Sequence, residues 1–291
     1  MIVYFANHNN KGSDNTEKHI KYALEKLGKE VLAIDENNYT LEEVIEATKS
    51  ADIFLFHKAG IKDGTNFQKF MELLTNTICP KVCWYFDKIW GDREMVVETI
   101  LPFIDKLFLT DETWKKKHTY NNVEVLRQGI GTEDTSAGKF RPELETEIAF
   151  VGQVYGDRIA FIEKLKKRYG DKVRVFGNIF NRDLYDLCAS TKIFVAPDSP
   201  GDNWYWSSRV YMILGSGGFL LHPKYEGLKE EFEHKKDLVY YNDFEDLCSK
   251  IDYYLRNEKR RKKIQEQGYK KCVEKYNYET RCAELLKKMG I

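Results

Sequence analysis

The chain has 291 residues, of which 42% are hydrophobic and 32% charged, a composition typical of a folded globular protein and unlike that of a disordered one. Lys+Arg and Asp+Glu both number 46, so the formal net charge is zero and bulk electrostatic binding to nucleic acid is disfavoured. The N-terminal apolar run is too short for a signal peptide, and no run reaches transmembrane length. The six cysteines show no metal-ligand spacing, so we expect a cytoplasmic protein with free thiols and no metal site.

Short apolar runs alternate with amphipathic helix patterns through the first half of the chain. Helices are predicted at Ile20–Leu27, 41–49 and 66–74, from apolar residues recurring at helical spacing. The predicted strands are Ile2–Ala6, Glu30–Ile34, Asp52–His57, Lys81–Phe86, Lys106–Thr110 and Val123–Leu126. Strands that alternate with helices indicate a parallel sheet covered on both faces.

The alternation lapses in a polar stretch with three glycines and a proline, and then it restarts. The second series of predicted strands is Ile148–Gly152, Val173–Gly177, Ile193–Ala196, Phe219–His222 and Leu238–Tyr241. Three helices without strands between them follow, at Phe244–Leu255, Lys259–Val273 and Tyr278–Met289. We therefore predict an α/β protein of two Rossmann-like domains facing a central cleft, with domain boundaries at 1–130, a linker at 131–146, a second domain at 147–275 and a C-terminal segment at 276–291.

In open parallel sheets, ligands bind outside the carboxyl ends of the strands. That rule nominates the loops that follow the predicted strands: Asn7–Asn15, His57–Gly60, Asp87–Gly91, Gly152–Arg158, Gly177–Phe180, Asp198–Arg209 and Pro223–Glu231.

One strand–helix–strand unit stands out among these loops. Ser207, Ser208 and Arg209 lead into a predicted helix at Ser208–Leu214, where unpaired backbone N–H groups suit an anion such as a diphosphate. The predicted helix ends in the turn Gly215–Gly218, and glycines at this position are also typical of an ordinary helix C-cap. The chain holds no Walker A sequence, no G-x-S-x-G elbow and no G-x-G-x-x-G, so P-loop, hydrolase and NAD-binding functions are poor fits.

An ordered series of motifs in the second half resembles a known family. The series is FVGQVYGDR, VFGN, IFVAPDSPG, SSRVYMILGSGGFLL and the helical sequence after YEGL, spanning Ile148 to Leu286. This part of the chain is similar to the GT-B glycosyltransferases, in particular the CgeB-like type of the glycosyl transferases group 1. The first half is compatible with that fold in pattern only.

The resemblance implies a GT-B fold, with a nucleotide-sugar donor bound by the C-terminal domain and an acceptor bound mainly by the N-terminal domain. It implies that the last helix crosses back to the N-terminal domain and that no obligatory metal or other cofactor is needed. Basic side chains would neutralise the diphosphate, and arginine suits bidentate contacts with oxyanions. The donor-binding residues expected on this basis are Gly152, Tyr155, Arg158, Gly177, Asn178, Asp198, Ser207, Ser208, Arg209, Tyr211, Glu226 and Gly227.

The sequence departs from the pattern of many retaining members at one point. These members carry an acidic residue, seven others and then a glutamate near the ribose. Counted along this chain, the glutamate position is Tyr211 and the first acid falls near Asp202 or Asn203. The stereochemical outcome is therefore left open, and Glu226 is the favoured alternative carboxylate.

An inverting transfer also needs a base for the acceptor hydroxyl. His57 and Asp87, each at the end of a predicted strand in the first half, are the candidates. A histidine there is also a common structural hydrogen-bonding residue, and an aspartate can equally cap a turn. The acceptor stays open among polysaccharide, lipid, protein, small molecule and modified base. The alternatives to a transferase are a non-catalytic nucleotide-sugar-binding protein and an epimerase of the same fold.

Overall fold

The structure is a computed structural model that describes residues 1–9, 15–57, 64–133, 138–197 and 203–291. The chain forms two compact units. Unit 1 holds the described residues up to Gly131 together with Tyr278–Ile291, and unit 2 holds the described residues from Thr132 to Asn277. Asp198, one of the predicted donor-binding residues, lies outside the described residues.

Unit 1 is built on a six-stranded sheet in the order β2-β1-β3-β4-β5-β6. All neighbouring strands are parallel. Its strands are β1 (Ile2–Ala6), β2 (Val31–Asp35), β3 (Ile53–Phe56), β4 (Lys81–Tyr85), β5 (Lys106–Leu109) and β6 (Val123–Val125). Consecutive strands are joined by crossovers that contain a helix, as the alternating pattern of the sequence predicts for the first three crossovers.

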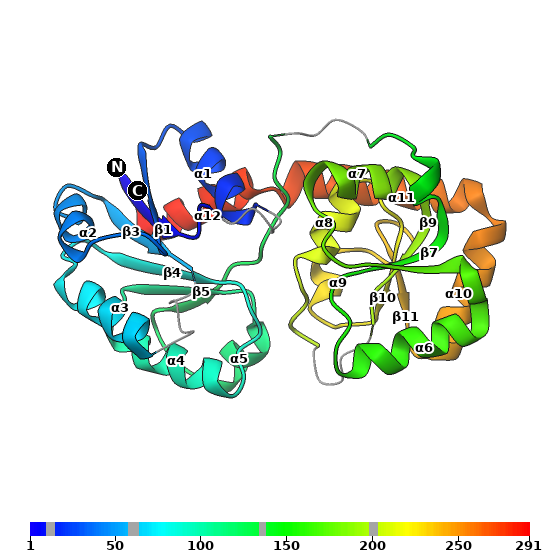
Figure 1. The fold of residues 1–291 in the computed structure, drawn as a ribbon, viewed down its shortest axis with the longest axis horizontal. Helices are drawn as coiled ribbons and strands as arrows, with labels where there is room; N and C mark the ends of the chain where they lie inside the picture. Colours follow the sequence, from blue (N-terminus) through cyan, green and yellow to red (C-terminus); the bar gives the residue numbers. More distant parts are fainter. Residues whose placement is uncertain (10–14, 58–63, 134–137, 198–202) are drawn as a thin grey trace. The chain divides into compact units, whose positions relative to one another are not determined.

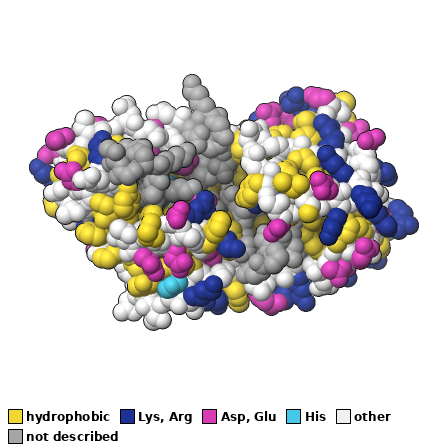
Figure 2. All heavy atoms as spheres, turned by 60° about the horizontal axis from the view of Figure 1, so that its bottom comes forward, with side chains coloured by type: hydrophobic (Ala, Val, Ile, Leu, Met, Phe, Trp, Pro, Cys, Tyr) yellow, Lys and Arg dark blue, Asp and Glu magenta, His cyan; other side chains and the backbone are white. Residues whose placement is uncertain are grey.

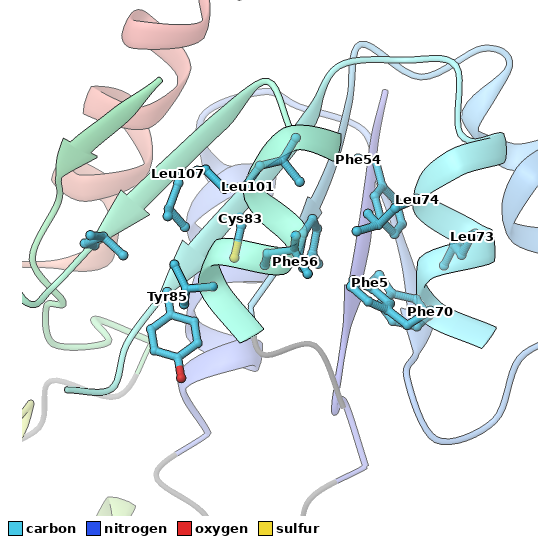
Figure 3. Close-up of a cluster of buried hydrophobic side chains, with 14 of the residues drawn as sticks. Phe5, Phe54, Phe56, Phe70, Leu73, Leu74, Cys83, Tyr85, Leu101 and Leu107 are labelled. Atoms are coloured by element: carbon cyan, nitrogen blue, oxygen red, sulfur yellow. The ribbon is translucent and has the colours of Figure 1, made fainter. Parts of the chain in front are cut away.

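Helices cover both faces of this sheet (Figure 1). On one face are α2 (Leu41–Thr48), α3 (Gly64–Asn76), α4 (Asp92–Ile100) and α5 (Glu112–Lys117). Successive strand residues point to opposite faces, so Val3 and Phe5 reach this layer while Ile2 and Tyr4 reach the other. Figure 3 shows the aromatic part of the first layer, where Phe5, Phe54, Phe56 and Phe70 pack together.

The opposite face of the sheet is covered by the two helices nearest the chain ends. These are α1 (Thr16–Lys26) and α12 (Tyr278–Met289), which pack against each other. Cys282, Leu285 and Leu286 of α12 are buried in the same cluster as Ile20 and Leu24 of α1. The C-terminal helix is therefore part of the unit that the N-terminus begins.

Unit 2 contains a five-stranded parallel sheet in the order β11-β10-β9-β7-β8. Its strands are β7 (Thr146–Val151), β8 (Val173–Phe176), β9 (Thr191–Val195), β10 (Leu220–Pro223) and β11 (Val239–Tyr241). The helices are α6 (Asp157–Tyr169), α7 (Asn181–Ser190), α8 (Arg209–Gly215), α9 (Leu228–Glu231), α10 (Phe244–Arg256) and α11 (Glu258–Lys275). Side chains of α6 and α10 share one buried cluster with the strands, and α7 and α8 lie on the other face (Figure 1).

Two general surface properties complete the description. Lys and Arg side chains are interspersed with Asp and Glu on the face shown in Figure 2, in keeping with the zero formal charge. Among the described residues, no helix is both long and apolar enough to cross a lipid bilayer.

Candidate functional site

The strand order of unit 2 defines where a ligand can approach its sheet. From β7 the chain crosses to β8 on one side, and β9 then lies on the other side of β7. The loops that leave β7 and β9 consequently diverge, and a crevice forms at such a switch point. Gly152 directly follows β7, and Arg209 opens the helix that follows β9. The two residues meet at this edge.

The absence of a side chain at Gly152 leaves space for the guanidinium group of Arg209. The glycine has a φ of +135°, and a Cβ built on it would lie 3.0 Å from Nη1 of Arg209. Residues with a side chain rarely adopt this backbone conformation, and the guanidinium of Arg209 occupies the space that a side chain at position 152 would need. Glycine at this position therefore permits the close approach of Arg209 to the loop after β7.

A second arginine is fixed in the same loop. Nη1 of Arg158 donates to the backbone oxygen of Gln153 at 3.0 Å, and the guanidinium lies 4.4 Å from the ring centre of Tyr155. A cation held over an aromatic face gains electrostatic attraction from the ring. Tyr155 itself is exposed. The sequence prediction of Gly152, Tyr155 and Arg158 thus names residues that the structure places side by side.

The guanidinium of Arg209 is affected by its burial and by the charge of Arg158. Burial lowers the pKa of Arg209, and the positive charge of Arg158 lowers that pKa further. Like charges near one another disfavour the charged state, and a bound anion relieves that repulsion. The edge of β7 and β9 is therefore suited to an anionic group with several oxygens, which arginine recognises with paired N–H donors.

His222, at the end of β10, extends this edge. Burial lowers its pKa to about 4, and the charge of Arg209 adds to the effect. Nδ1 donates to the backbone oxygen of Pro223 at 2.8 Å, so the neutral ring carries its lone pair on Nε2. The sequence analysis mentioned no role for this histidine, and its place at a strand end was the available signal.

The other predicted residues of the entrance loops are polar and accessible to different degrees. Asn178, after β8, accepts a hydrogen bond from Nε2 of Gln153 at 2.7 Å, which ties its loop to that of Gly152. Gly177 is exposed beside it. Ser207 and Ser208 are half-buried and precede α8, which has seven residues and begins at Arg209.

Tyr211, the position counted for the family glutamate, lies in the interior of unit 2. Its side chain is 1% exposed. The hydroxyl accepts from Nε1 of Trp206 at 3.0 Å and donates to the carboxylate of Glu231. A buried tyrosine in this network reaches a ligand only through its neighbours. The nearby carboxylate is supplied by Glu231, which the sequence analysis did not single out.

The loop after β10 places its two predicted residues differently. Glu226 is exposed and forms an ion pair with Lys229 at 2.6 Å, which lowers the pKa of its carboxyl. Gly227 is buried, and a Cβ there would lie 2.8 Å from the ring of Trp204. The backbone N–H of Gly227 donates to the oxygen of Asn203 at 2.9 Å. Glycine at this position lets the loop pack on the segment that precedes α8.

In unit 1, His57 is a buried residue that joins three strands. Nδ1 donates to the backbone oxygen of Trp84 at 2.9 Å, and Nε2 accepts from the hydroxyl of Tyr4 at 2.5 Å. The side chain is 5% exposed, and burial lowers its pKa to about 3. Both ring nitrogens are thus engaged in the core, which is the structural role that the sequence left open as the alternative to a base.

Asp87 and His8 lie closer to the surface of the same edge. Asp87 follows β4 and faces Nη1 of Arg93 at 3.6 Å. His8 follows β1, which together with β3 forms the switch point of this sheet. Its Nε2 donates to the oxygen of Tyr4 at 3.0 Å, so the neutral ring has its lone pair on Nδ1, and burial lowers its pKa. The rule that ligands bind at the carboxyl ends of parallel strands predicted the Asn7–Asn15 loop as part of a site. It did not single out His8 within that loop.

Solved structures with the same architecture place this chain among the GT-B glycosyltransferase folds, as the sequence predicted. HepE of Anabaena, in complex with UDP and glucose, superposes with a TM-score of 0.67 at 10% identity, covering 100% of this chain and 99% of that one. An alpha-glucosyltransferase in complex with UDP-glucose and abasic DNA gives 0.71 at 11% identity, with 100% and 99% coverage. A glycosyltransferase from Rickettsia africae gives 0.66 at 12% identity, with 99% and 97% coverage.

At these identities the likeness establishes the fold. Residues 145–287 also match the family model described as glycosyl transferase-like. They contain Arg158 and Arg209, which together we call the arginine site. No curated protein matches the chain at the level of sequence. The CgeB-like type stays a prediction.

Proposed function

We propose that this protein is a glycosyltransferase that moves a sugar from a nucleotide-diphosphate donor to an acceptor, with the diphosphate bound by Arg158 and Arg209. The observation that carries the proposal is the pairing of these two arginines at the switch point of unit 2. The positive charge of Arg158 acts on the buried Arg209, which favours an anion between them, and negative charge develops on a leaving diphosphate during transfer. Preorganised positive groups at that position stabilise the transition state more than the ground state.

The finer details of the donor follow from the same chemistry. Two guanidinium groups can neutralise a diphosphate without a cation, so we propose a metal-independent transfer. Complexes of HepE and of the alpha-glucosyltransferase contain UDP or UDP-glucose, which makes UDP-glucose the first donor to test and a hexosyl transfer the expected reaction. Asn178, Ser207, Ser208, Glu226 and the backbone at Gly177 and Gly227 are proposed to complete the donor site.

We assign the acceptor to unit 1. If the transfer inverts the anomeric carbon, a base must take the acceptor proton. Asp87 is partly exposed at the carboxyl edge of the sheet. His8 follows β1, which is separated from β4 by β3, and presents a lone pair on Nδ1 at the same edge. We propose these two residues for that role ahead of His57, whose ring nitrogens are both engaged.

Substitution of Arg209 by alanine tests the donor site. We expect Arg209→Ala to lose most of the affinity for UDP-glucose, by about tenfold or more, since a charge-assisted hydrogen bond contributes about 1.5–3 kcal/mol. Binding is measured by calorimetry, and turnover by mass spectrometry of released UDP. Arg168→Ala is the matched control, because Arg168 is an exposed arginine on α6, 4.0 Å from Asp252. Unchanged affinity of a folded Arg209→Ala protein for every nucleotide sugar tested would contradict the proposal.

A non-catalytic nucleotide-sugar-binding protein is the second candidate function. The observation in its favour is the buried Tyr211 at the counted position of the family glutamate. Slow hydrolysis of donor without acceptor supports the enzyme, whereas binding with no release of UDP over many hours supports the binding protein.

A further inference from the structure

Three metal-ligating side chains converge on unit 1, away from the arginine site of unit 2. Glu94 and Glu98 lie one turn apart on α4, and His118 directly follows α5. One ligand atom from each lies within 4.8 Å of the others, and no second group of this kind occurs in the described residues. Residues four apart share one helix face, so both carboxylates point to the same side of α4.

The histidine is held in the tautomer that a metal requires. Nδ1 of His118 donates to the backbone oxygen of Trp114 at 3.0 Å, which leaves the lone pair of the neutral ring on Nε2. The ring also stacks on Trp114 at 4.2 Å between ring centres and at 24°. Metal-binding histidines typically donate their other N–H to a carbonyl or carboxylate in this way. Nε2 of His118 is 3.6 Å from Oε1 of Glu94.

Trp114 orients the first carboxylate as well. Its indole N–H donates to Oε1 of Glu94 at 3.0 Å. The tryptophan is buried, so one rigid residue fixes both Glu94 and His118, while the exposed Glu98 can adjust. A tetrahedral zinc ion with bonds of about 2.1 Å needs ligand atoms about 3.4 Å apart. The spacing of Nε2 and Oε1 is close to that value.

Some of the lysine side chains near the site form contacts with other groups. The last turn of α5 carries Lys115, Lys116 and Lys117. Lys116 forms an ion pair with Glu112 at 3.0 Å, and Lys115 donates to the oxygen of Tyr120 at 3.3 Å. Lys115 and Lys116 therefore form these contacts with groups other than Glu94 and Glu98.

We propose that Glu94, Glu98 and His118 form a binding site for a divalent transition-metal ion such as Zn²⁺, with water completing the coordination. Imidazole and carboxylate ligands suit zinc and its neighbours in the first transition series rather than soft monovalent ions. A bound ion would join α4 to the end of α5 and stabilise unit 1 by mass action. The site is independent of the proposed donor chemistry.

Zinc titration of the metal-stripped protein tests this proposal. We expect one tight site by calorimetry, a single Co²⁺ absorption spectrum on substitution and a higher melting temperature with Zn²⁺. His118→Asn keeps an N–H for the oxygen of Trp114 but lacks Nε2, so affinity is expected to fall by about tenfold or more while the fold is kept. Trp114→Phe removes the indole donor and reduces the buried ring that stacks on His118, and it is expected to weaken binding by a similar factor.

The matched control is the exposed acidic pair Glu42 and Glu46, which has the same spacing on α2 without a histidine. E94Q/E98Q should lose the site, whereas E42Q/E46Q should bind zinc like the parent protein. Absence of a saturable site in the parent protein, or equal affinity of the parent and His118→Asn proteins, would overturn the proposal.

Discussion

The contact between Gly152 and Arg209 links a backbone conformation to a charge. The glycine has a φ that side chains rarely adopt, and the guanidinium lies where a side chain would be. A residue with a side chain would therefore both strain the loop and displace the cation. The motif FVGQ contains this glycine, so the sequence alone indicated its importance, but the arginine that it accommodates is 57 residues further along the chain. Only the fold brings the two together.

Substitution of Gly152, compared with a control glycine, separates the strain of the backbone from the displacement of the Arg209 guanidinium. Gly152→Ala is expected to weaken UDP-glucose binding by about tenfold, because the new Cβ would lie 3.0 Å from Nη1 of Arg209. Gly170→Ala is the control, since Gly170 has a φ of +57° and no atom within 4 Å of a built Cβ. Both variants should lose about 1 kcal/mol or more of stability from backbone strain. Calorimetry of donor binding distinguishes them, and equal binding by the two variants would argue against the role of Gly152.

Residues whose role depends on burial were harder to predict than those at strand ends. His57 was predicted from its place at the end of a strand, and Tyr211 from its count along the family pattern. Neither kind of evidence indicates the direction in which the side chain points. In the fold, both are buried with engaged polar atoms. Arg158 and Arg209 lie in loops at the carboxyl edge of the sheet, where the sequence placed them, and their role in binding stays a prediction.

At the scale of elements, strands were predicted more completely than short helices. Every strand was predicted within about two residues, because buried parallel strands are continuous apolar runs. The helices α4, α5 and α9 were not predicted. In α4 the buried residues Val96, Val97 and Ile100 are confined to its second half, and α5 buries Trp114 alone. Such patterns lack helical periodicity, and tertiary packing decides their structure.

Among the strands, His57 acts as a polar link whose strength depends on pH. It joins Tyr4 of β1 to Trp84 of β4 across the end of β3. The folded protein keeps the ring neutral down to a pKa of about 3, whereas the unfolded chain protonates it near pH 6.5. Below pH 6.5 the unfolded state thus binds a proton that the folded state does not, and stability falls as the pH falls.

We expect unit 1 to lose up to about 1.4 kcal/mol per pH unit from this histidine as the pH falls from 6 to 4. His57→Gln should be less stable at pH 7 but should show a shallower dependence on pH. Urea denaturation at several pH values, followed by the fluorescence of the tryptophans, measures both slopes. Identical slopes for the parent and variant proteins would show that His57 is not the titrating group.

At the scale of the whole molecule, the N-terminal unit is completed by the C-terminal helix. The backbone N–H of Tyr278 donates to the oxygen of Ile130 at 3.0 Å, so the two segments that connect the units are joined inside unit 1. The sequence predicted a last helix at the observed bounds of α12. The expectation that it returns to the N-terminal unit came only from the family resemblance, since an amphipathic helix does not specify its partner, and its packing against α1 is found in the fold.

Removal of residues 278–291 should therefore destabilise the opposite end of the sequence. The buried hydrophobic side chains Tyr278, Cys282, Leu285 and Leu286 of α12 would be lost together with the buried Arg281. Loss of a large core side chain costs about 2–5 kcal/mol, so the sum rivals the total stability of a typical domain. Hydrogen exchange should show rapid exchange in α1 and in strands β1 to β6 with unit 2 protected. Removal of Gly290 and Ile291 alone is the control, and protection of unit 1 in the longer truncation would contradict this expectation.

The discontinuity of unit 1 also sets the order in which the protein is completed on the ribosome. Unit 2 ends at Asn277, so its whole sequence is made before the helix that seals the first sheet has left the exit tunnel. Until then, Ile20, Leu24 and their neighbours present an apolar face without its cover, which is a surface for chaperones or for aggregation. The N-terminal unit is thus begun before unit 2 and completed after it, and a ribosome that stalls before α12 is made leaves a complete second unit attached to an incomplete first one.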